Sequence, residues 1–92
     1  MKDLTILRND LRSYFLNVKD YLKSGGNATI CAAKENCRFA CFGSLPWGIS
    51  STKFSQVLDW VPGSWNIESQ IDYCVEWVEN ELRKKSRLNF VS

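Results

Sequence analysis

The chain has 92 residues, of which 45% are hydrophobic and 24% charged, and its net charge is +2. This length suits one domain, 1–92, and the share of apolar residues excludes a disordered tail. No apolar run approaches the roughly 18 residues that a membrane-spanning helix needs. The first ten residues, MKDLTILRND, lack the apolar stretch of a secretory signal, so we expect a cytoplasmic protein with free thiols and no membrane contact.

The first predicted element is a helix that begins at Leu4 and ends near Leu22. Its apolar residues recur at spacings of three and four, as on one face of a helix: they are Leu4, Leu7, Leu11, Phe15, Val18 and Leu22. Asp3 can cap the N-terminus. The KSGG sequence at 23–26 ends the helix, because Gly25 can adopt a positive φ angle.

The next segment, 28–42, is ambiguous. As strands, Ala28–Ala33 and Cys37–Phe42 flank the polar tripeptide KEN at 34–36. Asn36 tolerates the left-handed conformation that a tight turn needs. The pattern therefore favours a short β-hairpin.

The alternative for this segment is a helix capped by Asn27 and ended by Gly43. Its apolar stripe would be untidy, since Phe39 and Phe42 fall on the side of Glu35. We therefore expect an α+β fold with an N-terminal helix, a β-hairpin, and a short and a long C-terminal helix. An all-α bundle is the alternative.

Two helices are predicted in the C-terminal half. The short one runs from Thr52 to Trp60, after a cap at Ser50 or Ser51, and stops because the residue before Pro62 avoids the helical region. The long one is capped by Asn66 or Ser64, and its predicted buried stripe is Ile67, Ile71, Cys74, Val75, Val78 and Leu82. Residues 89–92 can add an edge strand or fray.

The four cysteines could in principle bind a metal ion, and the chain has no histidine that could act as a further ligand. A structural zinc site would need all of Cys31, Cys37, Cys41 and Cys74, yet none of them form a closely spaced pair. In a strand, Cys37 and Cys41 would lie about 13 Å apart, and in a helix Cys31 would face elsewhere. We expect packing groups, with Cys37, Phe39 and Cys41 on one inward strand face, and no metal, cofactor or disulfide.

The sequence supports a catalytic site even less than a metal site. The absence of histidine excludes Ser-His and Cys-His nucleophilic catalysis. The five glycines form no phosphate-binding loop. We expect the protein not to be an enzyme and to have no catalytic residues.

Charge is segregated along the chain. Residues 54–82 contain six acidic groups and no lysine or arginine. Four of these groups form the acidic ridge of the last helix, namely Glu68, Asp72, Glu76 and Glu79, with only Arg83 placed to pair with Glu79. Tyr73 and Trp77 would stack on the other flank of that helix. The predicted partner-binding set is Asp59, Trp60, Trp65, Glu68, Asp72, Tyr73, Glu76, Trp77 and Glu79.

Carboxylates beside large aromatic side chains are typical of a surface that binds a basic protein. The leading hypothesis is a small cytosolic inhibitor or immunity-type protein. It would neutralise a larger basic partner, such as a nuclease toxin or a nucleic-acid-handling complex, by imitating phosphates. The competing interpretation is that the aromatic residues pack in the core and the carboxylates are merely solvated.

Two other functions remain open. A nucleic-acid-binding regulator would use basic groups at the C-terminus together with others near the N-terminus, namely Arg83, Lys84, Lys85, Arg87, Lys2, Arg8 and Arg12. A sequence pI near 8.4 is low for such a domain. A scaffold module could instead form a homodimer through exposed tryptophans.

Overall fold

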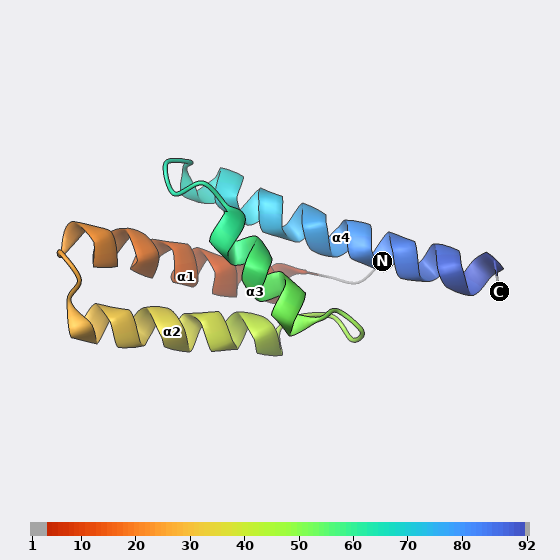
Figure 1. The fold of residues 1–92 in the computed structure, drawn as a ribbon, viewed down its shortest axis with the longest axis horizontal. Helices are drawn as coiled ribbons and strands as arrows, with labels where there is room; N and C mark the ends of the chain where they lie inside the picture. Colours follow the sequence, from red (N-terminus) through yellow and green to blue (C-terminus); the bar gives the residue numbers. More distant parts are fainter. Residues whose placement is uncertain (1–3, 92) are drawn as a thin grey trace.

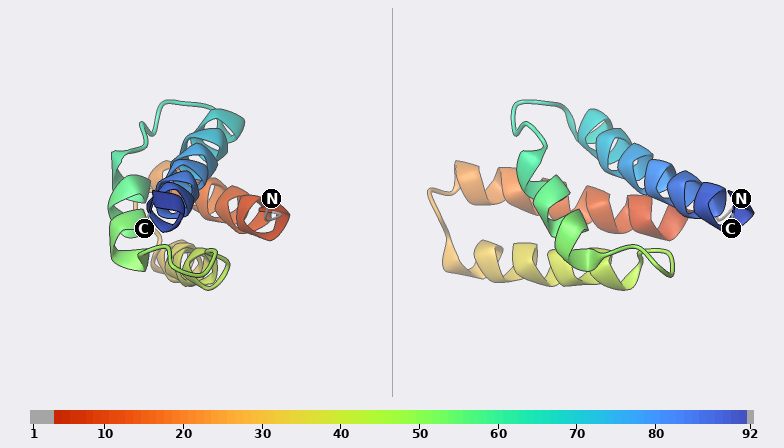
Figure 2. Two further views of the ribbon diagram at one scale, coloured as in Figure 1. Left: turned by 90° about the vertical axis from the view of Figure 1, so that its right-hand side faces the viewer. Right: turned by 45° about the vertical axis from the view of Figure 1, so that its right-hand side comes forward.

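The computed structural model describes residues 4–91, with side chains described for 4–85, and every element in this part is a helix. The helices are α1 (Thr5–Lys23), α2 (Ala28–Gly43), α3 (Ser51–Trp60) and α4 (Ile67–Val91). Helices α1 and α2 form an antiparallel pair, the short α3 crosses in front of them, and α4 runs beside α1 and extends past it (Figure 1). Viewed end-on, α1 and α3 lie on opposite sides, with α2 and α4 between them (Figure 2).

The predicted β-hairpin, and with it the α+β fold, is wrong: residues 28–43 form one helix, and the all-α alternative is confirmed over the described residues. Asn27 decides the conformation. Its Oδ1 atom accepts hydrogen bonds from the backbone N–H groups of Thr29 (2.9 Å) and Ile30 (3.2 Å). Those donors have no partner within a helix, so the cap stabilises the first turn. The predicted KEN turn at 34–36 lies in mid-helix.

The untidy apolar stripe of α2 is explained by how little of this helix is buried. Cys41 is its one fully buried residue, and Cys37 and Phe42 pack partly against the core. Phe39 points outward and is 65% exposed. The predicted inward face of Cys37, Phe39 and Cys41 is therefore wrong for Phe39, because helical spacing separates it from the two cysteines.

The ends of α1 and α3 follow the prediction closely. Helix α1 ends before Gly25, which has a φ angle of 74°. The predicted cap of α1, Asp3, lies outside the described residues. Ser50 caps α3 by accepting a hydrogen bond from the Lys53 backbone at 3.3 Å. Val61, before Pro62, is extended and ends α3.

Helix α4 begins after Asn66, whose Oδ1 atom accepts a hydrogen bond from the Ser69 backbone at 2.8 Å. Of the two predicted capping residues, Asn66 and Ser64, it is therefore Asn66 that caps α4. The backbone stays helical to Val91, so the edge strand considered for 89–92 does not form over 89–91.

The core lies where α1, α3 and α4 meet over the C-terminal half of α2. Its buried apolar members are Leu7, Leu11, Tyr14, Phe15, Cys41, Phe54, Val57, Leu58, Val61, Ile71, Cys74, Val75 and Val78. The predicted stripe of α4 is confirmed, with Ile67 and Leu82 only partly buried. Leu22, predicted as part of the α1 stripe, is instead exposed. Among the described helices, none combines the length and the hydropathy needed to cross a membrane.

Candidate functional site

The aromatic residues of the predicted site fall into two groups, Trp65 with Tyr73 and Trp60 with Trp77. Trp65 and Tyr73 form an edge-to-face pair with ring centroids 5.8 Å apart and an interplanar angle of 70°. Their exposed fractions are 40% and 39%. We call this pair the aromatic corner. A surface hollow of about 250 Å³ opens beside it, lined by Trp65, Asn66 and Ser69.

Side chains of α1 and α4 hold the turn that carries Trp65 through hydrogen bonds to its backbone carbonyl groups. The Lys19 ammonium of α1 donates hydrogen bonds to the carbonyl oxygens of Gly63 (3.2 Å) and Trp65 (3.0 Å). The Gln70 side chain of α4 donates to the carbonyl oxygen of Pro62 at 3.0 Å. The corner is therefore held in place before any partner arrives. No sequence pattern points to Lys19, which lies more than 40 residues from the turn it binds.

The predicted stacking of Tyr73 on Trp77 is wrong. Trp77 turns inward and packs against Phe54 of α3, with centroids 5.9 Å apart. Together with Trp60 it lines a groove between α3 and α4. Tyr73 and Trp77 lie one helical turn apart on α4, but their rings have different partners, because Tyr73 packs on Trp65 and Trp77 on Phe54.

The acidic ridge is half neutralised by α1. The Arg8 guanidinium lies 2.7 Å from the Asp72 carboxylate and 3.9 Å from that of Glu68. Arg12 also pairs with Glu68. Arg8 and Arg12 are four residues apart, as are Glu68 and Asp72, so the two pairs of side chains match in spacing on facing helices. The equal spacing allows this contact, but by itself it does not identify which helices face each other.

The second half of the ridge keeps its charge. Among the described side chains, Glu76 and Glu79 have no ion pair, and Glu76 is exposed. The predicted pairing of Arg83 with Glu79 is wrong, since Arg83 donates to the Asn80 side chain at 2.7 Å. Glu76 follows Tyr73 by three residues, which sets its carboxylate beside the aromatic corner.

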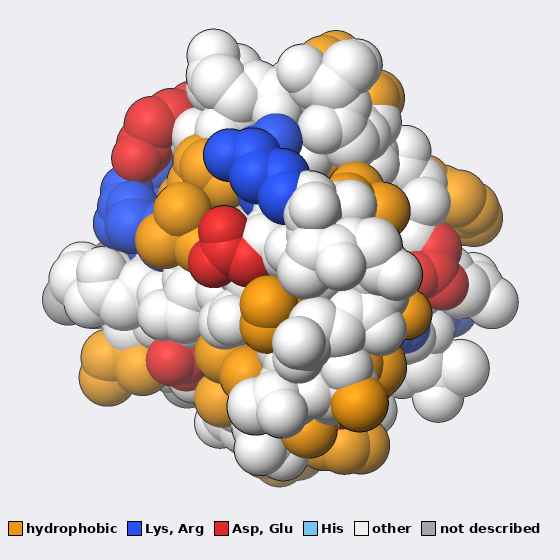
Figure 3. All heavy atoms as spheres, turned by 90° about the vertical axis from the view of Figure 1, so that its left-hand side faces the viewer, with side chains coloured by type: hydrophobic (Ala, Val, Ile, Leu, Met, Phe, Trp, Pro, Cys, Tyr) orange, Lys and Arg blue, Asp and Glu red, His pale blue; other side chains and the backbone are white. Residues whose placement is uncertain are grey.

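Figure 3 shows the end of the molecule where the α1–α2 turn and the loop before α4 lie. Acidic and basic side chains are intermixed with hydrophobic ones on this face, and neither sign of charge dominates it. The surface near the aromatic corner is thus apolar and mixed in charge, with the unpaired carboxylates further along α4.

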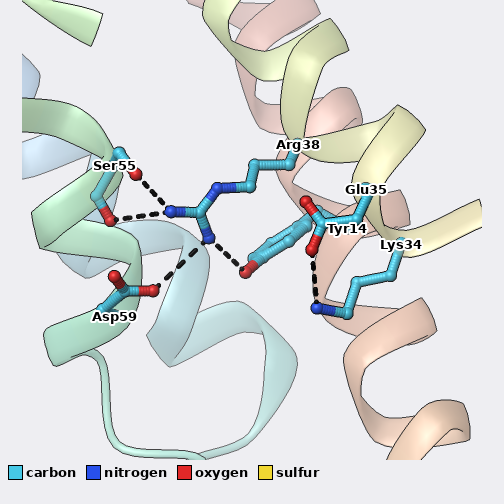
Figure 4. Close-up of polar contacts among 6 residues, drawn as sticks. All are labelled: Tyr14, Lys34, Glu35, Arg38, Ser55 and Asp59. Carbon is cyan, nitrogen blue, oxygen red and sulfur yellow. Dashed lines mark hydrogen bonds and ion pairs between the residues drawn. The ribbon is translucent and has the colours of Figure 1, made fainter. Parts of the chain in front are cut away.

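Asp59, also in the predicted set, belongs to a polar cluster that ties three helices together (Figure 4). The Arg38 guanidinium of α2 donates hydrogen bonds to the Tyr14 hydroxyl of α1 and to the Asp59 carboxylate of α3, both at 3.3 Å. It also donates to the hydroxyl and the carbonyl oxygen of Ser55. Burial raises the pKa of Tyr14, and the neighbouring Arg38 partly opposes that rise. The phenol therefore stays neutral, and the cluster serves the fold.

The basic residues proposed as an alternative site do not form one patch in the described part of the chain. Lys84 pairs with Glu81 at 3.1 Å. The Lys85 side chain lies against Gly48. Neighbouring residues of a helix point about 100° apart, so Arg83, Lys84 and Lys85 diverge. Arg8 and Arg12 are engaged by the ridge, while Lys2 and the side chain of Arg87 lie outside the described residues.

The cysteines are free thiols spread between the core and its border. Burial raises the pKa of both Cys41 and Cys74 to about 12. Cys37 accepts a hydrogen bond from the Asn17 side chain at 3.4 Å. In the part of the chain with described side chains, no group of three or more acidic or cysteine residues is placed to hold a metal ion. Cys41 and Cys74 act as small packing groups, as expected.

The aromatic corner with Glu76, and the groove between α3 and α4, thus each combine aromatic and charged side chains. Comparison of the chain with known protein families, with curated proteins and with solved structures finds no match in any of the three.

Proposed function

We propose that the protein is a small inhibitor or immunity-type protein that captures a larger basic protein through the outer face of α4. This face consists of Trp65, Ser69, Tyr73 and Glu76. The observation that carries the proposal is the aromatic corner, half-exposed beside a hollow and held in place from α1 and α4. A fixed aromatic pair loses little conformational freedom when a partner covers it.

Charge supports the same class of partner, although less strongly than the sequence suggested. Glu76 and Glu79 can steer an approaching basic surface and pair with its arginines or lysines. Glu68 and Asp72 already have arginine partners, so partner cations would have to compete for them. The face therefore resembles an apolar anchor with an acidic border more than a string of phosphates.

A nuclease toxin or a nucleic-acid-handling complex remains the proposed kind of partner, since such proteins carry basic surfaces. Four free thiols suit the reducing cytosol that we propose as the compartment. We propose no catalytic activity and no cofactor for this face.

Capture from lysate of the native cell, quantified by mass spectrometry, tests the proposal. Two variants alter the face, Trp65→Ala and Glu76→Lys, and Asp20→Lys on the exposed side of α1 is the matched control. We expect basic proteins enriched by the wild type to fall about tenfold or more with Trp65→Ala, since a central aromatic anchor contributes at least 1–2 kcal/mol. The Glu76→Lys variant should reduce the same proteins, and Asp20→Lys should not.

Circular dichroism must show that both variants remain folded, which the exposure of the two side chains favours. Equal capture by the wild type and a combined Trp65→Ala, Glu76→Lys variant would contradict the proposal. Loss of capture with Asp20→Lys alone would place the binding surface on α1 instead.

A further inference from the structure

The groove between α3 and α4 combines aromatic and basic side chains on the side of α4 away from the acidic ridge. It has a volume of about 310 Å³ and is lined by Lys53, Gln56, Val57, Trp60, Trp77, Glu81 and Lys84. Trp60 is 65% exposed, so a face of its indole ring is open to a ligand. Trp77 and the buried Val57 form the apolar part of the lining.

The charge that the groove presents to solvent is positive. Glu81 pairs with Lys84, but the Glu81 side chain is largely covered while that of Lys84 is mostly exposed. Lys53, on the α3 side, has no ion pair among the described side chains. Two ammonium groups, one from each helix, therefore line the same groove as the ring of Trp60.

A second aromatic side chain continues this surface beyond the start of α3. The Lys85 side chain lies within 3.5 Å of the position that a Cβ atom on Gly48 would occupy. Trp47, the preceding residue, is 92% exposed. Lys53 and Trp60 are seven residues apart on α3, a rise of about 10 Å. Trp47 is thus an exposed indole next in the chain to the residue that Lys85 contacts, and Lys85 follows Lys84 of the groove.

We propose that this groove binds single-stranded nucleic acid, with a base stacked on Trp60 and phosphates bound by Lys53 and Lys84. Exposed aromatic rings alternating with cations are the means by which proteins bind unpaired strands without reading their sequence. Trp47 offers a second stacking surface and Lys85 a third cation. The ligand surface differs from the outer face of α4, so the inference does not depend on the proposed function.

Two other occupants fit the groove less well. An amphipathic helical peptide needs a row of apolar contacts at i, i+4 and i+7. The apolar lining here is shorter than such a row and is formed by Val57 and Trp77. A second copy of the chain docked groove to groove would bring lysines against lysines. Charge complementarity therefore favours an anionic, flat-faced ligand.

Fluorescence anisotropy of a labelled twelve-nucleotide oligo-dT provides the test. We expect a Kd of roughly 10⁻⁵ M at low salt, as for sequence-independent binding. If three lysines contact phosphates, log K should fall with log salt at a slope of about −2, and Lys53→Gln with Lys84→Gln should reduce the slope to about −0.7. Trp60→Ala should weaken binding at least fivefold, and Trp60→Phe should keep most of it.

Lys23→Gln, at the exposed end of α1, is the matched control and should leave binding and slope unchanged. A duplex of the same length should compete poorly, because its bases are already stacked. The proposal is overturned by any one of three results: no binding, binding that survives Trp60→Ala, or equal competition by oligoglutamate of the same charge. A concentration-dependent mass in sedimentation that Trp60→Ala abolishes would also overturn it, in favour of a homodimer.

Discussion

Arg38 joins three helices through a single guanidinium group. Its side chain is only 17% exposed, and its partners are the Tyr14 hydroxyl, the Asp59 carboxylate and Ser55. Helix α2 buries little apolar surface of its own, so these polar contacts help to hold α2 against α3. A buried charge without partners destabilises the folded state, and so do buried polar groups that lose a charged partner.

We predict that Arg38→Met lowers the free energy of unfolding by about 2–3 kcal/mol, because the hydroxyl of Tyr14 and the carboxylate of Asp59 lose a charged donor. Urea denaturation measures this. Arg83→Met is the control, since Arg83 is exposed and its partner among the described side chains is Asn80 of the same helix, and it should change stability by less than about 0.5 kcal/mol. Equal effects of the two variants would remove the structural role assigned to Arg38.

The thiols should separate into two reactivity classes. Thiolate is the reactive form, and burial raises the pKa of Cys41 and Cys74 to about 12. We predict that iodoacetamide at pH 8 modifies Cys31 and Cys37 in the folded protein, and Cys41 and Cys74 only on unfolding. Mass spectrometry of the labelled peptides checks this, and rapid labelling of all four cysteines would contradict the core described above.

The raised pKa values of Cys41 and Cys74 also make the free energy of unfolding depend on pH. A thiol whose pKa is higher in the folded state stabilises the fold fully below its unfolded pKa. That contribution is lost as pH rises from about 9 toward about 12. The free energy of unfolding should therefore decline over this alkaline range.

Among the helices, α1, α3 and α4 were predictable because each has residues that mark where it begins or ends. Helix α1 has a regular apolar stripe and a glycine stop, α3 has Ser50 and Pro62, and α4 has Asn66. Segment 28–43 was misassigned because β-branched and aromatic residues in short runs also suit strands. Its alanines and the Asn27 cap favour a helix, and the exposed Phe39 hid the helical stripe.

Two asparagines distinguish the helix from the hairpin at this segment. In the helix, Asn27→Ala removes the cap and should lower the free energy of unfolding by about 1 kcal/mol. Asn36→Ala, at an exposed mid-helix position, should be neutral or slightly stabilising. A hairpin turning at 34–36 would give the reverse order. Urea denaturation of both variants, compared with the wild type, decides between them.

Across the complete fold, the sequence could name candidate site residues but not their neighbours. It marked Trp65, Tyr73 and Glu76 as site residues, and they do lie together on one face. It could not show that Arg8 and Arg12 would neutralise half of the acidic ridge, because those contacts span 64 and 56 residues. Pairing between helices depends on tertiary packing, which a pattern within one helix does not contain.

The same packing creates two unlike surfaces on one small protein. Trp77 turns toward α3 and, with Trp60 of α3, lines a groove that also contains two lysines, while Trp65 and Tyr73 form the aromatic corner near Glu76. One surface suits a basic protein and the other suits an anionic strand. The proposed protein partner should therefore contact α4 on its outer face and leave the groove open.

Site-specific photocrosslinking in the native cell shows which face of α4 contacts the partner. A photoreactive phenylalanine analogue at Ser69, in the hollow beside Trp65, should crosslink to a basic protein. The same analogue at Asn9, on the exposed side of α1, should not crosslink to it. The account predicts a discrete adduct at Ser69 that disappears when Glu76→Lys is added. No adduct at Ser69, or the same adduct from Asn9, would contradict it.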